Sequence, residues 1–208
     1  MERPSNRALI SVALFAPENS RYRHSLQSMD AIGTIIDKSR PELFGEVDLA
    51  IFLIEADRGI SNEEISTFQQ IRELQLPTLI LVASLLLDSK GSDQWDFDDV
   101  IMLVNRVLEP AITPFLVLHG DDGTPSGLFD LARKKVIDYS GANPNEIEPE
   151  SDLMNLTQEF RTEYEESGYS ESDFISGLTV VALPFIPERG IGLVETAHLL
   201  TKLQQAQI

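Results

Sequence analysis

The sequence has 208 residues, of which 42% are hydrophobic, enough to bury the core of one domain with an insertion or of two small domains. Thirty-four Asp and Glu against 16 Lys and Arg give a formal charge of −18, which disfavours direct binding to nucleic acid because that affinity depends on cations displacing counterions. The absence of cysteine excludes thiolate metal sites, thiol catalysis and disulfides, and it favours a reducing, cytoplasmic location.

The first elements follow from two apolar patterns. The near-continuous apolar run Ala8–Ala16 predicts a buried strand, which the turn Pro17–Ser20 ends. The next segment, from Arg21 to about Ile36, is predicted to be a helix because apolar residues recur in it at spacings of four, three, three and four. These residues are Tyr22, Leu26, Met29, Ile32 and Ile36.

The segment Asp48–Leu87 predicts a strand, a helix and a second strand. The run Leu49–Ile54 ends in a turn, and Ser61 then lies three residues before Glu64, the pattern of a capping box at a helix start. The run Leu79–Leu87 is uncharged and too short to span a membrane, as expected of a strand covered on both faces. Such units form parallel strand pairs, and ligands gather outside the carboxyl ends of their strands. The predicted helix presents one apolar face, formed by Ile65, Phe68, Ile71 and Leu74.

A helix is predicted from about Trp95 to Leu108, with three aspartates in its first turn, Asp96, Asp98 and Asp99. Negative charge suits this end of a helix, so we favour a structural role over a metal cluster. Two strands, Phe115–His119 and Gly127–Leu131, are predicted to flank a turn.

The last third of the sequence is acidic at first and apolar at its end. Between Glu146 and Asp173 there are ten acids and one base, and we favour a solvated helix face over a docking surface for a basic partner. A helix from Ser151 is predicted to pack Leu153, Leu156, Phe160 and Tyr164. A short helix from Ser170 to Gly177, a strand from Leu178 to Ile186 and a final helix follow. The apolar face of that final helix comprises Leu193, Ala197, Leu200 and Leu203.

This order of elements predicts an α/β fold, with a mostly parallel sheet covered by helices on both faces. The sheet is expected to contain the runs that begin at Ala8, Leu49, Leu79, Phe115 and Leu178. The region from about Gly120 to Gly177 is expected to form an inserted α+β subdomain.

Five segments in a consistent order resemble a known family. Asp48–Gly59 is similar to a strand with a D-x-x-x-G-V turn, and Gly127–Tyr139 is similar to a G-v-i-D-L strand followed by K-A-x-x-Y. The acidic helix from Ser151, the segment from Tyr169 to Leu178 and the ending Pro187–Ile191 complete the order. Together they resemble the guanine-nucleotide-binding domain of elongation factor G and related translational GTPases. The resemblance implies a P-loop-GTPase-like core over residues 1–119 and 178–208 and an inserted subdomain over 120–177.

The phosphate-binding motif of that family is not preserved. A phosphate loop needs glycines that let backbone N–H groups approach the phosphates, a lysine, and a hydroxyl for magnesium. By the resemblance, the first glycine, the second glycine, the lysine and the hydroxyl residue are replaced by Ala16, Arg21, Tyr22 and Arg23. Such a loop is not expected to bind a polyphosphate.

Neighbouring positions add to this loss. Pro17 removes a backbone donor, and Glu18 would repel a polyphosphate. Asp37 is the candidate for the aspartate of the D-x-x-G element, with Arg40 in place of the glycine. The N-K-x-D element that reads guanine is replaced by Ala83, Ser84, Leu85 and Leu86, so no carboxylate is available for the base.

The leading hypothesis is therefore a pseudo-GTPase, without catalytic residues, cofactor or metal, that acts through an unidentified protein partner in translation or its regulation. The first alternative is a GTP-binding enzyme with a non-standard site that uses Arg21, Arg23 and Lys38. The second is a small-molecule binding module at the crevice outside the strand ends. We expect no contact with nucleic acid or membrane.

Overall fold

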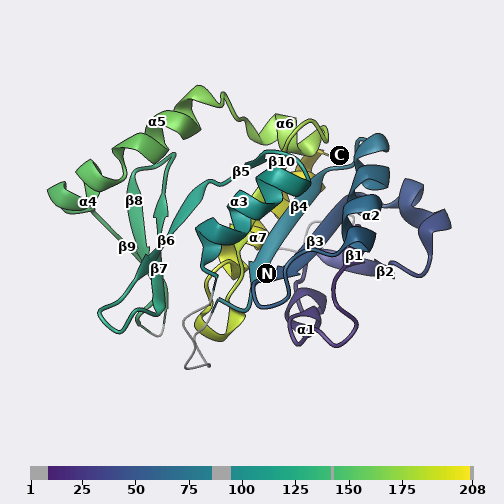
Figure 1. The fold of residues 1–208 in the computed structure, drawn as a ribbon, viewed down its shortest axis with the longest axis horizontal. Coiled ribbons are helices and arrows are strands. Elements are labelled where there is room, and N and C mark those ends of the chain that lie inside the picture. Colours follow the sequence, from purple (N-terminus) through teal and green to yellow (C-terminus); the bar gives the residue numbers. More distant parts are fainter. Residues whose placement is uncertain (1–8, 86–94, 142, 207–208) are drawn as a thin grey trace, which may run out of the picture.

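A computed structural model describes residues 9–85, 95–141 and 143–206 and contains two sheets (Figure 1). The larger sheet has six strands, and every pair of neighbours in it is parallel. In sheet order the strands are β2 (Ile32–Asp37), β1 (Ile10–Phe15), β3 (Leu49–Glu55), β4 (Thr78–Ala83), β10 (Val180–Pro184) and β5 (Ala111–Ile112). With helices on both of its faces, this sheet confirms the predicted α/β class.

Side chains of the central strands point alternately into two apolar clusters, as the pleat of a strand requires. Phe15 and Phe52 contribute to the cluster under one set of helices, whereas Leu14 and Ile51 contribute to the other. The first set comprises α2 (Asn62–Glu73), α3 (Phe97–Val107) and the 3₁₀ turn η1 (Pro41–Glu46). The second set comprises α1 (Arg23–Gln27), α6 (Glu171–Ile175) and α7 (Leu193–Ala206). Burial on both faces explains why β3 is apolar from Leu49 to Ile54 and β4 from Leu79 to Ala83.

The predicted helix starts are set by side-chain caps. Ser61 and Glu64 form the capping box predicted for α2, and Ser170 forms a second box with Asp173 at α6. Asp96 caps α3 by accepting a hydrogen bond from the N–H of Asp99. Asp96 and Asp99 therefore have the predicted structural role. Among the described residues there is no group of three metal-ligating side chains.

The second sheet is antiparallel and joins β6 (Phe115–His119), β7 (Pro125–Asp130), β8 (Lys135–Asp138) and β9 (Asn145–Ile147). Helices α4 (Ser151–Leu156) and α5 (Gln158–Glu166) cover one of its faces (Figure 1). Successive residues of β7 pack into different apolar clusters. Leu128 packs into the main cluster, whereas Phe129 packs under α4 and α5. A second 3₁₀ turn, η2 (Pro187–Arg189), lies between β10 and α7.

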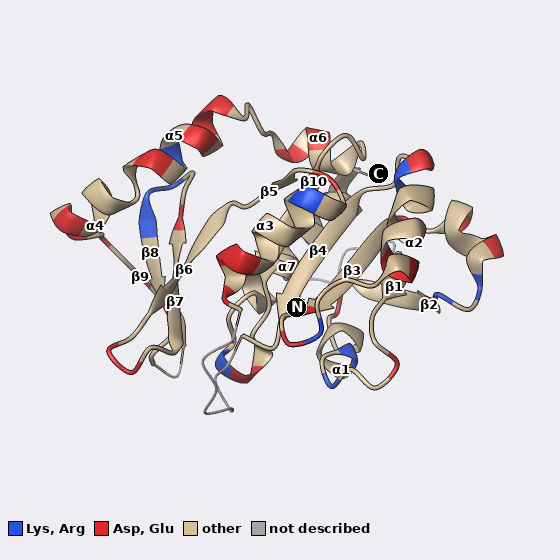
Figure 2. Ribbon diagram, viewed as in Figure 1, with Lys and Arg blue, Asp and Glu red and all other residues tan. Residues whose placement is uncertain are grey.

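All charged side chains of α4 and α5 except Arg161 are acidic, and a basic run, Arg133–Lys135, lies nearby at the turn into β8 (Figure 2). Lys134 forms an ion pair with Glu165 at 3.1 Å. Arg133 and Lys135 pair with Glu146 and Glu148, respectively. The basic run is thus neutralised within the second sheet and its covering helix.

Two predicted elements are wrong. The helix predicted over residues 21–36 ends at Gln27, and Ile32–Asp37 is instead the edge strand β2, paired in parallel with β1. The run Phe115–His119 does not belong to the parallel sheet but is the first strand of the antiparallel one, whereas the short β5 takes the edge position next to β10.

Some predicted faces are also misplaced. Leu156 is 75% exposed and Phe160 is 44% exposed, so the acidic segment packs mainly through Leu153 and Tyr164. Leu74 is exposed at the end of α2, and Ala197 is exposed on α7, where Leu199 is buried instead. Ala8 and residues 86–87, at the ends of two predicted strands, lie outside the described residues. In the described part of the chain, no helix has the length and apolarity needed to cross a membrane.

Candidate functional site

The carboxyl ends of the parallel strands meet at one edge of the sheet. The chain runs from β1 to β2 on one side and returns to β3 on the other side of β1, so the strand order reverses between β1 and β3. Ligands of open α/β sheets bind at such a reversal, outside the carboxyl ends of the strands. The residues after β1, β3 and β4 therefore form the candidate site.

The turn after β1 uses its own polar groups to close on itself. The Ser20 N–H donates to the Pro17 carbonyl at 3.0 Å, and the Tyr22 N–H donates to the Ser20 hydroxyl at 3.3 Å. The Arg23 N–H also bonds within the turn, to the Ser20 carbonyl. These backbone donors are not directed at an incoming anion, and the five-residue α1 that follows is too short to add a substantial helix dipole.

Tyr22 crosses from this turn to the end of β4. Its ring is 2% exposed and lies edge-on to Phe185, with ring centroids 6.5 Å apart. Its hydroxyl oxygen accepts hydrogen bonds from the Ser84 N–H at 3.1 Å and from the Arg21 guanidinium at 2.8 Å. Ser84 has a φ of 60°, a left-handed conformation that costs free energy for a serine. The Tyr22 side chain thus fills the gap between two strand ends.

The basic side chains around the turn all have carboxylate partners. Arg23 pairs with Asp37 at 2.9 Å and also donates to the carbonyls of Ala16 and Pro17. Burial acts to raise the pKa of Asp37, but the Ser39 N–H and the Arg23 guanidinium together lower it below its ordinary value. Two further pairs are Lys38 with Glu63 at 3.1 Å and Arg21 with Glu188 at 3.4 Å.

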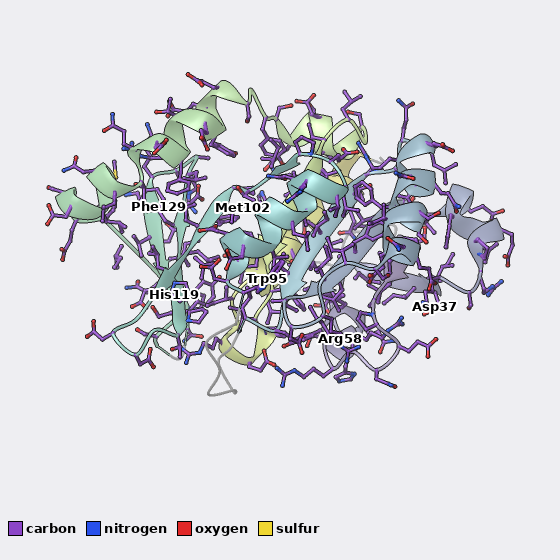
Figure 3. The ribbon with its side chains drawn as sticks, in the orientation of Figure 1. Asp37, Arg58, Trp95, Met102, His119 and Phe129 are labelled. Carbon is purple, nitrogen blue, oxygen red and sulfur yellow. The ribbon has the colours of Figure 1, made fainter. Side chains whose placement is uncertain are left out.

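A cavity of 290 Å³ lies between the ends of β1 and β3 and the start of α2. Ala16, Pro17 and Gly59 line it, together with three glutamates and two cations. Arg58 pairs with the buried carboxylate of Glu55 at 2.8 Å, and Figure 3 shows Arg58 near the turn and Asp37 at the outer strand. Because the charged lining is predominantly acidic, this cavity disfavours a phosphate group.

The structure thus brings together most of the positions that the resemblance assigns to a nucleotide site. Ala16, Pro17, Arg21, Tyr22 and Arg23 form the turn. Glu18 is an exposed residue of the same turn, Asp37 adjoins the turn through Arg23, and Ala83 and Ser84 meet it from β4. Leu86 lies outside the described residues. The contact of Tyr22 with Ser84 and the contribution of Glu188 carry no signal in the sequence, because the partners are far apart along the chain.

These features define the class as an α/β protein with a parallel sheet, a second antiparallel sheet, and a strand-end crevice filled by its own side chains. No protein-family model matches the chain, and no curated protein matches it. The crystal structure of ttk003000868 from Thermus thermophilus is similar in fold, with a TM-score of 0.60 and 20% sequence identity. The match covers 77% of this chain and 27% of that chain, so this chain spans about a quarter of the length of its structural neighbour. At this identity the likeness concerns the fold alone.

Proposed function

We propose that this chain is a pseudo-GTPase of the elongation factor G type, which does not bind or hydrolyse GTP and acts by contact with another protein. The observation that carries the proposal is the placement of Tyr22. By the resemblance, Tyr22 occupies the position of the phosphate-binding lysine and Ser84 lies in the guanine-reading element. In the folded chain these two residues are hydrogen-bonded to each other.

The charges around the turn support the same proposal over an enzyme with a non-standard site. Phosphoryl transfer depends on cations that stabilise the transferring group. Arg21, Arg23 and Lys38 are each held by a carboxylate, so a nucleotide would have to displace Glu188, Asp37 or Glu63. It would also bring its own negative charge to an acidic cavity.

Calorimetric titration with GTP, GDP and ATP in the presence of magnesium tests this proposal. Hydrogen bonds to charged groups contribute roughly 1.5–3 kcal/mol each, so the loss of three weakens binding by about three to six orders of magnitude. We expect no micromolar binding of any of the three nucleotides. Magnesium-dependent, micromolar binding of GTP with ATP excluded would show that the proposal is wrong.

Two variants distinguish a nucleotide site that is only blocked by the Tyr22 side chain from a chain that lacks the groups needed to bind GTP. Tyr22→Ala removes the side chain that fills the crevice, and Tyr22→Lys restores the family's lysine. Neither change supplies a carboxylate for guanine, because Ala83–Leu86 remains in place. We therefore expect neither variant to prefer GTP over ATP, and a gain of such a preference in Tyr22→Ala would contradict the absence of a base-reading element.

We propose that the protein partner binds at a groove of 430 Å³ between α3 and α5. Its apolar lining includes Met102 and Phe160. Met102 is 64% exposed and lies on the side of α3 that faces the second sheet (Figure 3). Asp98 and Glu163 lie among these apolar residues. Burial, together with the charges of neighbouring aspartates, raises the pKa of Asp98, so a cationic partner would relieve a local excess of negative charge. Because Phe160 is exposed beside these acids, we propose this groove as a docking surface for a basic amphipathic helix, in place of the solvated face that the sequence favoured.

Titration with a synthetic lysine–leucine amphipathic peptide tests this surface. The combined change Met102→Ser and Phe160→Ser is expected to weaken peptide binding about tenfold or more, because it removes the apolar contacts. Leu178→Ser is the matched control, since Leu178 is 62% exposed and does not line the groove. Equal binding by the two variants would exclude this groove as the docking surface.

We place this function in the cytoplasm, on the absence of cysteine. The connection to translation rests on the resemblance to translational GTPases, and the high negative charge makes a protein a better candidate partner than nucleic acid.

A further inference from the structure

A larger cavity, of 460 Å³, lies between the second sheet, α7 and the parallel sheet. None of the residues that line it also lines the 290 Å³ cavity at the ends of β1 and β3. Its volume falls in the range of about 300–1,000 Å³ that is usual for small-molecule sites. Its wall combines apolar and aromatic side chains, among them Phe115, Tyr164, Tyr169, Val194 and Leu199. The cavity therefore has the size and lining of a ligand site that is separate from the candidate nucleotide site at the strand ends.

Two carboxylates in this wall are almost completely buried. Asp130 and Glu195 are each 6% exposed. Glu195 accepts hydrogen bonds from the Tyr139 hydroxyl at 2.6 Å and from the Gly192 N–H at 3.1 Å. In the described part of the chain, no Lys, Arg or His side chain forms an ion pair with Glu195. Glu195 is held in place by neutral donors without compensation of its charge.

The negative charge of Asp130 is only weakly compensated by a neighbouring cation. One of its oxygens accepts a hydrogen bond from the Arg133 N–H at 2.8 Å. The guanidinium of Arg133 lies 3.9 Å from the other oxygen, because it is directed mainly at Glu146. A buried carboxylate with a distant cation leaves the wall with an excess of negative charge.

The remaining charges of the wall are already paired with one another. Arg133 pairs with Glu146, and His198 bonds to Glu171 at 2.9 Å. Lys202, which does not line the cavity, bonds to the same Glu171 carboxylate at 2.9 Å. Burial raises the pKa of Asp130 and of Glu195, and the charge of Asp130 raises the pKa of Glu195 further. A cation in the cavity would offset this repulsion.

The aromatic side chains of the wall also favour a cationic ligand. The rings of Tyr164 and Tyr169 lie 6.1 Å apart at an angle of 57°. Aromatic faces attract cations and also pack against apolar groups. A ligand with a charged head and an apolar body would match both parts of the wall.

We propose that this cavity binds a protonated organic amine, with its ammonium group at Asp130 and Glu195 and its apolar body against Tyr164, Tyr169 and Val194. An anion is disfavoured by the two buried carboxylates. A neutral compound gains only the apolar contacts.

Phenethylamine is a suitable probe, because it joins an ammonium group to an aromatic ring, and 2-phenylethanol is its neutral counterpart. Titration of the full chain, followed by calorimetry and by NMR, is expected to show binding of phenethylamine at millimolar concentration and at least about tenfold weaker binding of 2-phenylethanol. In the NMR spectra, the shifted resonances should be those of Tyr139, Tyr164, Tyr169 and Val194.

Asp130→Asn tests the role of the charge, because its amide oxygen can still accept the hydrogen bond from the Arg133 N–H. This variant should bind phenethylamine about tenfold more weakly and 2-phenylethanol unchanged. Asp152→Asn is the matched control, since it removes one negative charge from an exposed position on α4 and should bind both probes as the unmodified chain does.

Two results on the unmodified chain would overturn the proposal, and neither depends on the folding of a variant. The first is the absence of phenethylamine binding at millimolar concentration. The second is equal binding of the amine and the alcohol, which would show an apolar cavity without preference for a cation.

Discussion

The link between Tyr22 and Ser84 can be tested by removing a single oxygen. Tyr22→Phe keeps the ring against Phe185 but removes the acceptor of the Ser84 N–H, 3.1 Å away, and of the Arg21 guanidinium, 2.8 Å away. A hydrogen bond contributes about 0.5–1.5 kcal/mol, and a buried donor left without its acceptor costs about 1–3 kcal/mol. Ser84 would also lose a bond that holds its left-handed conformation. We therefore expect the free energy of unfolding to fall by about 1–3 kcal/mol.

Urea denaturation followed by circular dichroism measures this change, and thermal unfolding should show a drop of about 2–4 °C for each kcal/mol. Tyr169→Phe is the matched control, because Tyr169 is half-buried and its hydroxyl forms no hydrogen bond with the described residues. If Tyr22→Phe and Tyr169→Phe lower the free energy of unfolding equally, the contact with Ser84 has no special role. The reasoning would then be refuted.

Three further predictions concern stability. Burial raises the pKa of the Asp130 carboxyl group above its ordinary 3.8, so the folded chain binds the proton of this group more tightly than the unfolded chain does. The stabilisation that comes from this proton is present below the unfolded pKa and is lost as the pH rises through the folded pKa. In urea titrations, Asp130→Asn should therefore gain stability relative to the unmodified chain as the pH rises above about 4, the ordinary pKa of an aspartate. Gly177→Ala should cost about 2 kcal/mol or more, because Gly177 has a φ of +70° and a Cβ there would lie 1.9 Å from the Gln75 carbonyl oxygen. Gly45→Ala, with nothing within 4 Å, should stay within about 0.5 kcal/mol in the same thermal scans. Phe129→Ala should lower the free energy of unfolding by about 3–5 kcal/mol in urea, since Phe129 is fully buried under α4 and α5, and a loss below about 1 kcal/mol would exclude that packing as a main source of stability.

The elements that could be predicted from the sequence are those whose signals are local. The capping box of Ser61 and Glu64 and the apolar runs in β3 and β4 are each signalled within a few residues, and the structure contains all three. The helix predicted over residues 21–36 failed because pairing of Ile32–Asp37 with β1 outweighed the helical spacing. β-branched residues and Gly33 in this segment favour a strand over a helix interior.

The candidate site was predictable in outline only. The strand ends that form it follow from the order of elements, but the partner of Tyr22 depends on how two distant loops meet. The same is true of the buried pair formed by Tyr139 and Glu195. Glu195 lies on the side of the last helix opposite its predicted apolar face, so the local pattern does not indicate its burial.

The order of strands in the parallel sheet has a consequence for how the chain folds. β10 lies between β4 and β5, although it follows both of them in the sequence. During synthesis, the edge of β4 stays unpaired and β5 has no neighbour until Val180–Pro184 has emerged, by which time the whole second sheet has been made. Non-local pairing of this kind folds slowly and leaves strand edges open to other chains. The most aggregation-prone stage of folding should thus be the interval before β10 is inserted.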